Sequence, residues 1–417
     1  MKTKFVILIN RIQEHLWFRP FVFCLLSVAA ALFAHQADET SLNELVPEIK
    51  TESIEDLLDI LSASMLVIAI FAVGSMLSAY SAAGRTATPR SFKIIITDDV
   101  SQYALSTFIG AFIFSIVATV ALGNGYYNKA GKFILFVITL IFFTAVILIF
   151  LRWVDRISRL GRLEHTILQV EKVAEKSISK YNKNPLRNAL PVSGEFIGGQ
   201  AILAHKTGYV QNINMEALQE LAESLDLKIR LNCLPGKFVN ENFEIVHLRS
   251  TGDTEITKEV EKKINQTIEI GHTRLFDEDP RFGLITLTEI ASRALSPGIN
   301  DPGTAIQIIG CHEKLFYLWN NPEKTENDLL YDRLEIPQIE ISDFFDDAFK
   351  PISRDGAGFM EVMLRLQKAF CALEKINHNA IKTASKQHSK YAFKRAQITM
   401  DMEEDLEILE KASLFRK

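Results

Sequence analysis

Hydrophobic residues are concentrated in the first 151 positions of the chain, and most of the charged residues follow them. Four long apolar runs lie at Leu16–Ala34, Ile60–Gly84, Tyr103–Leu122 and Phe133–Leu151. About 20 helical residues, at about 1.5 Å each, cross the roughly 30 Å hydrocarbon core of a bilayer. A buried core helix is the alternative for one such run, but soluble cores rarely need four helices that are apolar on every side. The pattern therefore predicts a domain of four transmembrane helices over residues 1–151.

The first run also has features of a cleaved signal peptide, because the basic residues Lys2, Lys4 and Arg11 precede it. About twenty residues come before its hydrophobic core, which is long for a leader, and no clean Ala-x-Ala cleavage site follows it. We therefore expect this helix to be retained.

Lysine and arginine are unevenly distributed among the segments that flank the four runs. The basic segments contain Lys2, Lys4, Arg11 and Arg19 before the first run, Arg85, Arg90 and Lys93 between the second and third, and Arg152, Arg156, Arg159 and Arg162 after the fourth. The other two loops are poor in them, and residues 35–59 carry eight acidic residues against one lysine. Since basic loops stay in the cytoplasm, both termini are expected there. Arg152, Arg156 and Arg159 would lie at the headgroups of anionic lipids, primarily as a topology signal.

Small residues recur at a spacing of four within the apolar runs. Gly74, Ser78 and Ala82 form such a stripe in the second run, and Ser106 and Gly110 begin another in the third. Stripes of this kind let helices approach closely in lipid. Packing within one subunit is the plain interpretation, and a subunit interface or a pore lining is the sharper one. The middle parts of the last three runs lack ionisable residues, which argues against a proton or sodium relay.

The pattern changes after residue 151. Residues 152–184 keep helical spacing and are expected to continue the fourth helix into the cytoplasm, until Asn184-Pro185 ends it. Residues 185–253 contain short strands and turns, with a helix expected at Met215–Ser224 and a strand at Leu227–Leu231. Their hairpins resemble those of small biotinyl- or lipoyl-like barrels. Because they lack a lysine at the position where such domains attach a cofactor, a structural barrel is the preferred interpretation.

Residues 254–417 are expected to be mainly helical, with two long helices at Phe359–Thr383 and Tyr391–Ser413. Leu334–Ile341 interrupts them as an alternating segment with a proline, which predicts an edge strand or an extended loop. The expected fold class is an α-helical membrane protein, with four transmembrane helices and a cytoplasmic α+β region in which a small β-barrel-like module is followed by helices.

Composition excludes several classes of function. A formal net charge of −5 does not suit a nucleic-acid partner, whose binding needs concentrated positive charge. The four cysteines, Cys24, Cys233, Cys311 and Cys371, are scattered without a Cys-x-x-Cys pair. That spacing indicates reduced structural thiols and neither a disulfide framework nor a zinc site.

The densest polar stretch, residues 269–304, supplies the candidate site. Its candidate residues for a buried ionic network or a ligand site are Arg274, Asp279, Arg281, Arg293, Asn300 and Asp301. The plain interpretation of the end of this stretch is a helix cap, in which Asn300 or Asp301 caps the next helix and proline lies in its first turn. The three acids at 277–279 are adjacent, so their side chains should diverge and not hold one cation together. Glu269-x-x-His272 has the spacing of a di-iron helix, but a second such tetrad on a helix is lacking. We therefore expect neither a metal nor a cofactor.

Several motifs resemble those of a bacterial membrane-protein family named domain of unknown function 2254. They are Pro89-Arg90, Gly208-Tyr-Val-Gln, Asp279-Pro-x-Phe-Gly283 and Arg293-Ala-Leu-Ser-Pro-Gly-x-Asn-Asp-Pro-x-Thr304-Ala. The resemblance covers nearly the whole chain and implies a bacterial inner membrane. It brings no catalytic residues to carry over.

The sequence does not favour an enzyme, since it contains no nucleophile elbow, phosphate-binding glycine loop or nucleotide fingerprint. A homo-oligomeric channel or passive conduit, regulated by its cytoplasmic domain, fits the small-residue helices and the uncharged helix centres. The alternative is a membrane-anchored scaffold or signalling protein whose helices only anchor the cytoplasmic domain. A ring of subunits around an axis would favour the conduit, and a solid bundle the anchor.

Overall fold

The computed structural model describes residues 18–39, 45–92, 94, 99–194, 198–250, 256–320 and 328–416. The chain divides into two compact units, Met1–Thr166 and Ile167–Lys417. Among the basic residues that support the expected orientation, Lys2, Lys4, Arg11 and Lys93 lie outside the described residues.

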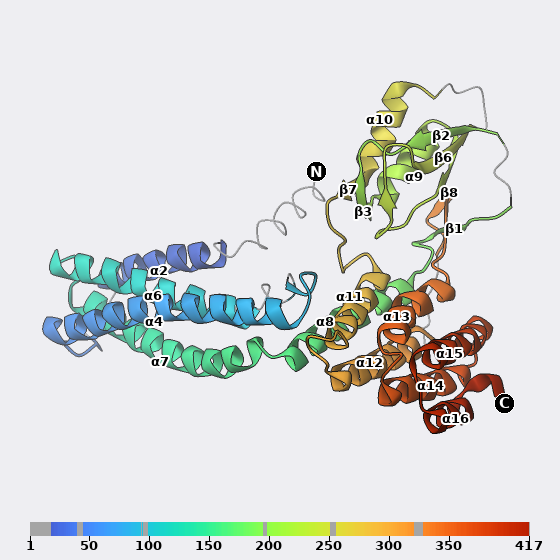
Figure 1. Cartoon of the computed structure of the whole chain (residues 1–417). Helices are drawn as coiled ribbons and strands as arrows, with labels where there is room; N and C mark the ends of the chain where they lie inside the picture. Colours follow the sequence, from blue (N-terminus) through green and yellow to red (C-terminus); the bar gives the residue numbers. More distant parts are fainter. Residues whose placement is uncertain are drawn as a thin grey trace. The chain divides into compact units, whose positions relative to one another are not determined.

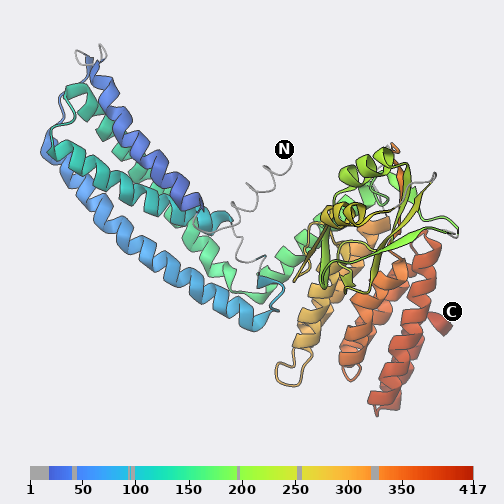
Figure 2. The same cartoon turned by 90° about the horizontal axis from the view of Figure 1, so that it is seen from above.

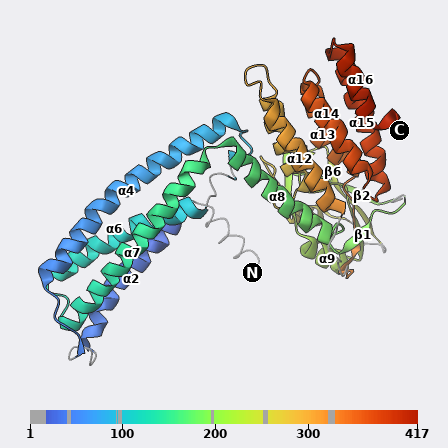
Figure 3. The same ribbon diagram turned by 90° about the horizontal axis from the view of Figure 1, so that it is seen from below.

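The N-terminal unit contains four helices long and apolar enough to cross a membrane among the described residues. The helices of this unit are α2 (Phe18–Gln36), η1 (Ala37–Glu39), α4 (Thr51–Thr86), α6 (Asp99–Gly123) and α7 (Lys129–Leu160). They lie lengthwise beside one another (Figure 3). Helix α4 begins nine residues before the second apolar run, so several acids of the preceding loop lie in its first turns, where the helix dipole favours negative charge.

Helix α6 is the central helix of this unit, since it packs against α2, α4 and α7. Half of its apolar window is buried, compared with 17–28% for the other three helices. Phe108 and Phe114 of α6 and Trp153 of α7 are fully buried. Their rings contact further aromatic side chains, including an edge contact of 6.3 Å between the centroids of Phe108 and Trp153. Large side chains therefore fill the centre of the bundle.

Helix α7 ends at Leu160, and a separate helix, α8 (Leu163–Lys183), follows it. The expected continuous helix to residue 184 is therefore wrong. Gly161 terminates α7, and glycine has a low helix propensity. A side chain at Gly161 would contact α4, because an added Cβ would lie 3.4 Å from the Cβ atom of Ala82.

The C-terminal unit contains two open sheets, which lie near helices α9 and α10 (Figure 1). The five-stranded sheet has the order β1 (Ala189–Pro191), β8 (Tyr331–Ile336), β4 (Leu227–Leu231), β6 (Glu244–Ser250) and β2 (Gln200–Leu203). The three-stranded sheet has the order β5 (Phe238–Val239), β3 (Gly208–Ile213) and β7 (Ile268–Gly271). The expected α+β region is confirmed, but the described strands form no closed barrel, so the barrel-like expectation is wrong.

Strand β8 corrects the expectation of an edge strand or extended loop. It lies inside the five-stranded sheet, parallel to β1 on one side and to β4 on the other. Pro337 follows the last residue of the strand, so it removes no ladder hydrogen bond. Because β7 and β8 come from beyond residue 253, the sheets are assembled across the expected boundary between the β-rich module and the helical region.

The remaining helices are α9 (Met215–Ser224), α10 (Lys258–Thr267), α11 (Pro280–Ala294), α12 (Pro302–Asn320), α13 (Ile341–Asp355), α14 (Met360–Glu374), α15 (Asn379–Thr399), α16 (Glu403–Ala412) and η2 (Leu414–Arg416). Helices α12 to α15 run side by side in the orange and red part of the chain (Figure 2). Their core includes the fully buried rings of Phe345, Phe349 and Phe370. The chain closes with three helices, α14 to α16, where the pattern predicts two, because breaks follow Glu374 and Thr399.

Candidate functional site: an ionic cleft at the start of helix α11

Asp279 is the central residue of the candidate site, and only 1% of its surface is exposed. It is the N-cap of α11, where its Oδ1 accepts a hydrogen bond from the backbone N–H of Arg281 at 3.1 Å. Its Oδ2 accepts from Nε of Arg274 at 2.6 Å. Burial raises the pKa of Asp279, while Arg274, the hydrogen bond from the Arg281 backbone and the Arg281 charge act in the opposite direction. Asp followed by Pro is a typical helix start, since Asp caps the first N–H groups and proline needs none.

Arg281 connects α11 to α13 through two carboxylates. Its Nε donates to Oδ2 of Asp347 at 2.6 Å, and its Nη1 donates to Oδ2 of Asp343 at 2.6 Å. Burial acts to lower the pKa of Arg281, but Asp347 and Asp343 outweigh it and raise that pKa. Asp343 and Asp347 are four residues apart and therefore lie on one face of α13.

The loop between β4 and β5 lies directly against Asp279. Gly236 in this loop has φ +95°, a conformation that residues with a side chain rarely adopt. A Cβ at this position would lie 2.2 Å from Oδ2 of Asp279. The Gly236 N–H also donates to the carbonyl of Val210 at 2.8 Å, which attaches the loop to β3. Glycine is therefore required both by the backbone conformation and by the close approach of the carboxylate.

These residues border a cleft of about 410 Å³. The residues that line it include Tyr209, Asn232, Cys233, Gly236, Lys237, Phe238, Arg274, Arg281, Gln338 and Asp343. Arg274 and Arg281 pair with the carboxylates of Asp279, Asp343 and Asp347, whereas Nζ of Lys237 lies 5.6 Å from the centre of the Phe243 ring. Burial raises the pKa of Cys233 to about 12, so its side chain is a neutral thiol and a poor nucleophile. The arrangement is chemically suited to joining the β-rich part to α11 and α13 through ion pairs.

The structure brings together only half of the six residues selected from the sequence. Arg274, Asp279 and Arg281 meet in the ionic cleft. Arg293 is twelve residues after Arg281 on the same helix, which at 1.5 Å per residue places it about 18 Å away along the helix axis. The expected single network that includes Arg293 and Asp301 is therefore wrong.

Asn300 and Asp301 lie in the turn that begins α12. Oδ1 of Asp301 accepts from the Thr304 N–H at 3.1 Å, and its Oδ2 accepts from the Thr304 hydroxyl at 2.6 Å. The capping interpretation is thus confirmed for Asp301. Asn300 has φ +54°, in the left-handed region that asparagine tolerates better than most residues.

Sequence reasoning missed Asp343 and Asp347, the two acids that pair with Arg281. They lie more than sixty residues away along the chain, in the first half of an amphipathic helix. The spacing of four was a usable signal that the two share a face. It did not indicate which basic residue they would meet.

Three consecutive acids, Asp277 to Asp279, point to different partners. Asp277 lies 3.9 Å from Nζ of Lys176, Glu278 pairs with Lys180 and Arg187, and Asp279 pairs with Arg274. The expected divergence of these acids is confirmed. Glu244 and His247, which have the same Glu-x-x-His spacing as Glu269 and His272, lie on strand β6 and not on a helix. The described residues contain no group of three or more metal-binding side chains.

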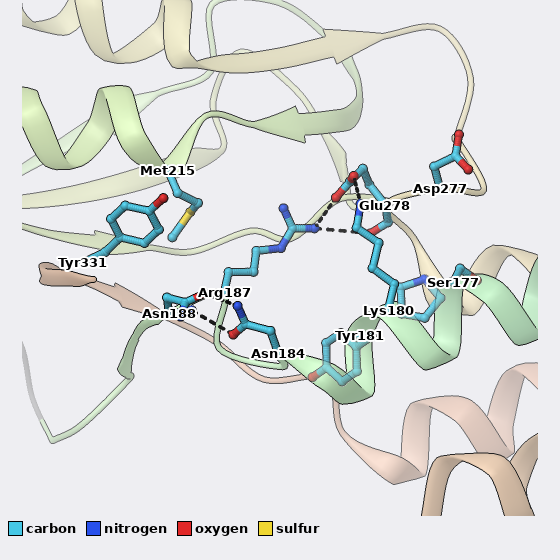
Figure 4. Close-up of a pocket in the computed structure, with 11 residues that line it drawn as sticks. Ser177, Lys180, Tyr181, Asn184, Arg187, Asn188, Met215, Asp277, Glu278 and Tyr331 are labelled. Carbon is cyan, nitrogen blue, oxygen red and sulfur yellow. Dashed lines mark hydrogen bonds and ion pairs between the residues drawn. The ribbon is translucent and has the colours of Figure 1, made fainter. Parts of the chain in front are cut away.

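A second cavity, of about 250 Å³, lies beside the segment with the three acids, Asp277 to Asp279 (Figure 4). Lys180 and Arg187 approach Glu278 in it, and Tyr331 and Met215 form another part of its lining. Asp277, Glu278 and Pro280 thus line this cavity, while Asp279 between them contacts Arg274 and Gly236 of the ionic cleft.

The small-residue stripes of the apolar helices have different surroundings. Gly110 and Ser106 of α6 are buried, and an added Cβ at Gly110 would lie 3.2 Å from the Cβ atom of Phe23 on α2. Gly74 and Ser78 of α4 are exposed, and an added Cβ at Gly74 would have nothing within 4 Å. Packing within one subunit therefore explains the small size of Ser106 and Gly110 but not that of Gly74 and Ser78. Ala82 lies next to Gly161, where an added Cβ would be 3.4 Å from the Cβ atom of Ala82.

Among the residues that the structure describes, four helices able to cross a membrane are followed by an α+β unit, which defines this chain as a predicted membrane protein. Residues 13–372 match the family described as predicted membrane protein (DUF2254), and the chain belongs to that family.

The chain is also similar to two uncharacterized mycobacterial proteins. It is 32% identical over 110 residues to one from Mycobacterium bovis and, to the same extent, to one from Mycobacterium tuberculosis. The matched part is 26% of this chain and 21% of each relative, so it spans about a fifth of the relatives' length. No solved structure matches the chain.

Proposed function

We propose that this chain is a membrane-anchored scaffold or signalling protein, in which the apolar helices hold the C-terminal unit at the cytoplasmic face of the bacterial inner membrane. The observation that carries the proposal is the filled interior of the N-terminal unit. Phe108, Phe114 and Trp153 occupy the space at the centre of the bundle, which a conduit within one subunit would need. This proposal reverses the preference for a conduit that the helix sequences alone suggest.

The basic residues around the apolar helices support the cytoplasmic placement. Arg85 and Arg90 follow the apolar part of α4, and Arg152 and Arg159 are exposed on the last turns of α7. Arg159 pairs with Asp155 at 2.8 Å, and both side chains are more than half exposed. Such a pair contributes little to stability. Arg152 and Arg159 are therefore accessible to anionic lipid headgroups.

The ionic cleft suits a scaffold better than a catalyst. Its charges are neutralised by opposite charges within the same unit, and they join α11 and α13 to the loop at Gly236. We infer that this cleft fixes the relative position of the sheets and the helices, and that the protein acts through binding and not through a chemical reaction.

A homo-oligomeric conduit is the second candidate, and one observation favours it. Gly74 and Ser78 lie on the exposed face of α4, where nothing in the same subunit explains their small size. Small residues on a lipid-facing surface allow a second helix to approach closely. A passage between subunits would need such contacts.

Reconstitution into liposomes separates the two functions. The anchor proposal predicts that purified protein causes no more release of potassium or of carboxyfluorescein than empty liposomes. Flux that depends on the protein, and that is lost in Ser78→Leu but kept in Ile70→Leu, would reject the anchor and support a conduit between subunits. Ile70 is a matched control because it is also exposed on α4, at 67%.

A further inference from the structure

In the second cavity two cations, Lys180 and Arg187, share the carboxylate of Glu278. The other carboxylate of the lining, Asp277, lies 3.9 Å from Nζ of Lys176, which offsets its charge. Glu278 accepts from Nη2 of Arg187 at 2.9 Å and also pairs with Lys180. The described contacts of Arg187 use Nη2, and the described residues make no hydrogen bond to its Nε or Nη1. Figure 4 shows the guanidinium in the middle of the cavity, with Glu278 at its tip. One positive charge and several N–H donors therefore remain for a further anion.

The backbone that carries Arg187 is held in an uncommon conformation. Arg187 and Asn188 both have positive φ angles, of 50° and 61°. Consecutive left-handed residues persist where surrounding contacts hold them, often at binding sites. Here the Asn188 N–H donates to Oδ1 of Asn184 at 2.8 Å, and the Asn188 carbonyl accepts from the Tyr331 N–H at 2.9 Å. This turn fixes the direction in which Arg187 enters the cavity.

The shape of the cavity limits the ligand. Its volume of about 250 Å³ suits a small molecule, since one water molecule takes up about 30 Å³ in the liquid. Tyr331 and Met215 add an aromatic ring and a thioether to the lining, opposite the charged groups (Figure 4). The ligand therefore needs a compact anionic end and a small, less polar body.

We propose that this cavity binds a small phosphomonoester, with its phosphoryl group between Arg187 and Lys180 in place of the Glu278 carboxylate. A phosphomonoester carries nearly two negative charges at neutral pH, so it neutralises both cations where one carboxylate neutralises one. Arginine matches phosphate oxygens through paired N–H donors, and lysine adds a point charge. The proposal goes beyond the anchoring role and does not depend on it.

A displacement of Glu278 would also move the ionic cleft, because Glu278 is adjacent in the chain to Asp279. Glu278 is followed by Asp279, which caps α11 and presses against Gly236. A ligand that moves Glu278 thus acts on the residue that joins the sheets to α11. This connection gives a scaffold a means of responding to a small metabolite.

Substitutions of opposite effect test the site in the purified full-length chain. Glu278→Gln removes the competing carboxylate, and we expect it to tighten binding of inorganic phosphate and of glycerol 3-phosphate by about tenfold. Lys180→Met should weaken binding by a similar factor, and it is a safe substitution because 58% of its side chain is exposed. Glu335→Gln is the matched control, since Glu335 pairs with Arg230 at 2.6 Å outside the cavity and should leave the affinity unchanged.

Isothermal titration calorimetry at pH 7.5 measures these affinities, and a melting curve without ligand shows that each variant is folded. Phosphatidic acid in mixed micelles carries the same monoester on a lipid, so binding of it but not of glycerol 3-phosphate assigns the site to a headgroup. Absence of binding to both the wild type and Glu278→Gln would overturn the proposal. Equal phosphate affinity in the wild type, Glu278→Gln and Lys180→Met would also overturn it, because the anion would then bind elsewhere.

Discussion

Replacing Asp279 perturbs the ionic cleft at the most deeply buried of its paired charges. In Asp279→Ala, the N-cap of α11 and the partner of Arg274 are lost together. Loss of a cap costs about 1 kcal/mol, and leaving one member of a buried ion pair alone costs roughly 3–5 kcal/mol. Because Arg274 keeps 18% of its side chain exposed, water can offset part of this cost. We expect a total of about 3 kcal/mol.

The melting temperature of the purified chain in detergent measures this loss. For a unit of about 250 residues, residues 167–417, each kcal/mol shifts the melting temperature by roughly 2–4 °C, which gives a decrease of about 6–12 °C. Asp279→Asn keeps an oxygen at the cap and should lose about half as much. Alkylation of Cys233, which is buried in the wall of the cleft, should become faster in Asp279→Ala, as mass spectrometry of the labelled peptide would show.

A double-mutant cycle and a control isolate the ion pair. Arg274→Met combined with Asp279→Asn should recover at least about 1 kcal/mol relative to the sum of the single losses. Asp301→Ala removes a cap from α12, and should therefore lower the melting temperature by only about 2–4 °C. If Asp279→Ala melts within 2 °C of the wild type, or no lower than Asp301→Ala, the reasoning about the buried pair is wrong.

Three further predictions concern other parts of the chain. Gly110→Ala should destabilise the bundle, because its Cβ would lie 3.1–3.2 Å from atoms of α2. Gly74→Ala should be neutral or stabilising by up to about 1 kcal/mol, because its Cβ would have nothing within 4 Å. Equal melting temperatures of the two variants would contradict this. Burial lowers the pKa of His312 to about 3 and of His388 to about 4. Below pH 6.5 the unfolded chain therefore binds more protons than the folded chain, so the stability of the folded chain should fall as the pH decreases from 6.5 to 4. This slope should become shallower in His388→Gln, and an unchanged slope argues against the pKa shift. Reporter fusions after Lys50 and after the last residue should report the periplasm and the cytoplasm respectively, and an external C-terminus would reverse the proposed orientation.

Local sequence patterns accounted for the positions of many elements. Strand β4 and helix α9 have the residues that the pattern predicts, Leu227–Leu231 and Met215–Ser224. The cap at Asp301 was recognisable too. Each of these features depends on residues within a few positions of one another, so a short stretch of sequence contains all the necessary information.

The candidate site was only half predictable because its other half is not local. Arg274, Asp279 and Arg281 were selected from one polar stretch, but Asp343 and Asp347 approach from α13. The alternation around Leu334 predicted a strand or an extended loop, yet not its place between two other strands. Pairing in a sheet depends on which segments the whole chain brings together, and the pattern of a single strand does not specify its neighbours.

Local sequence is enough to predict the four helices able to cross a membrane that the described residues contain, because uncharged runs of such length have few other stable environments. The faces of those helices that pack against neighbours depend on the folded chain. Gly110 packs against α2 and Gly74 does not, although both belong to similar stripes of small residues. Lipid and a neighbouring helix are both apolar, so hydrophobicity cannot distinguish a packed face from an exposed one. That distinction depends on the shape of the partner helix, which only the folded chain supplies.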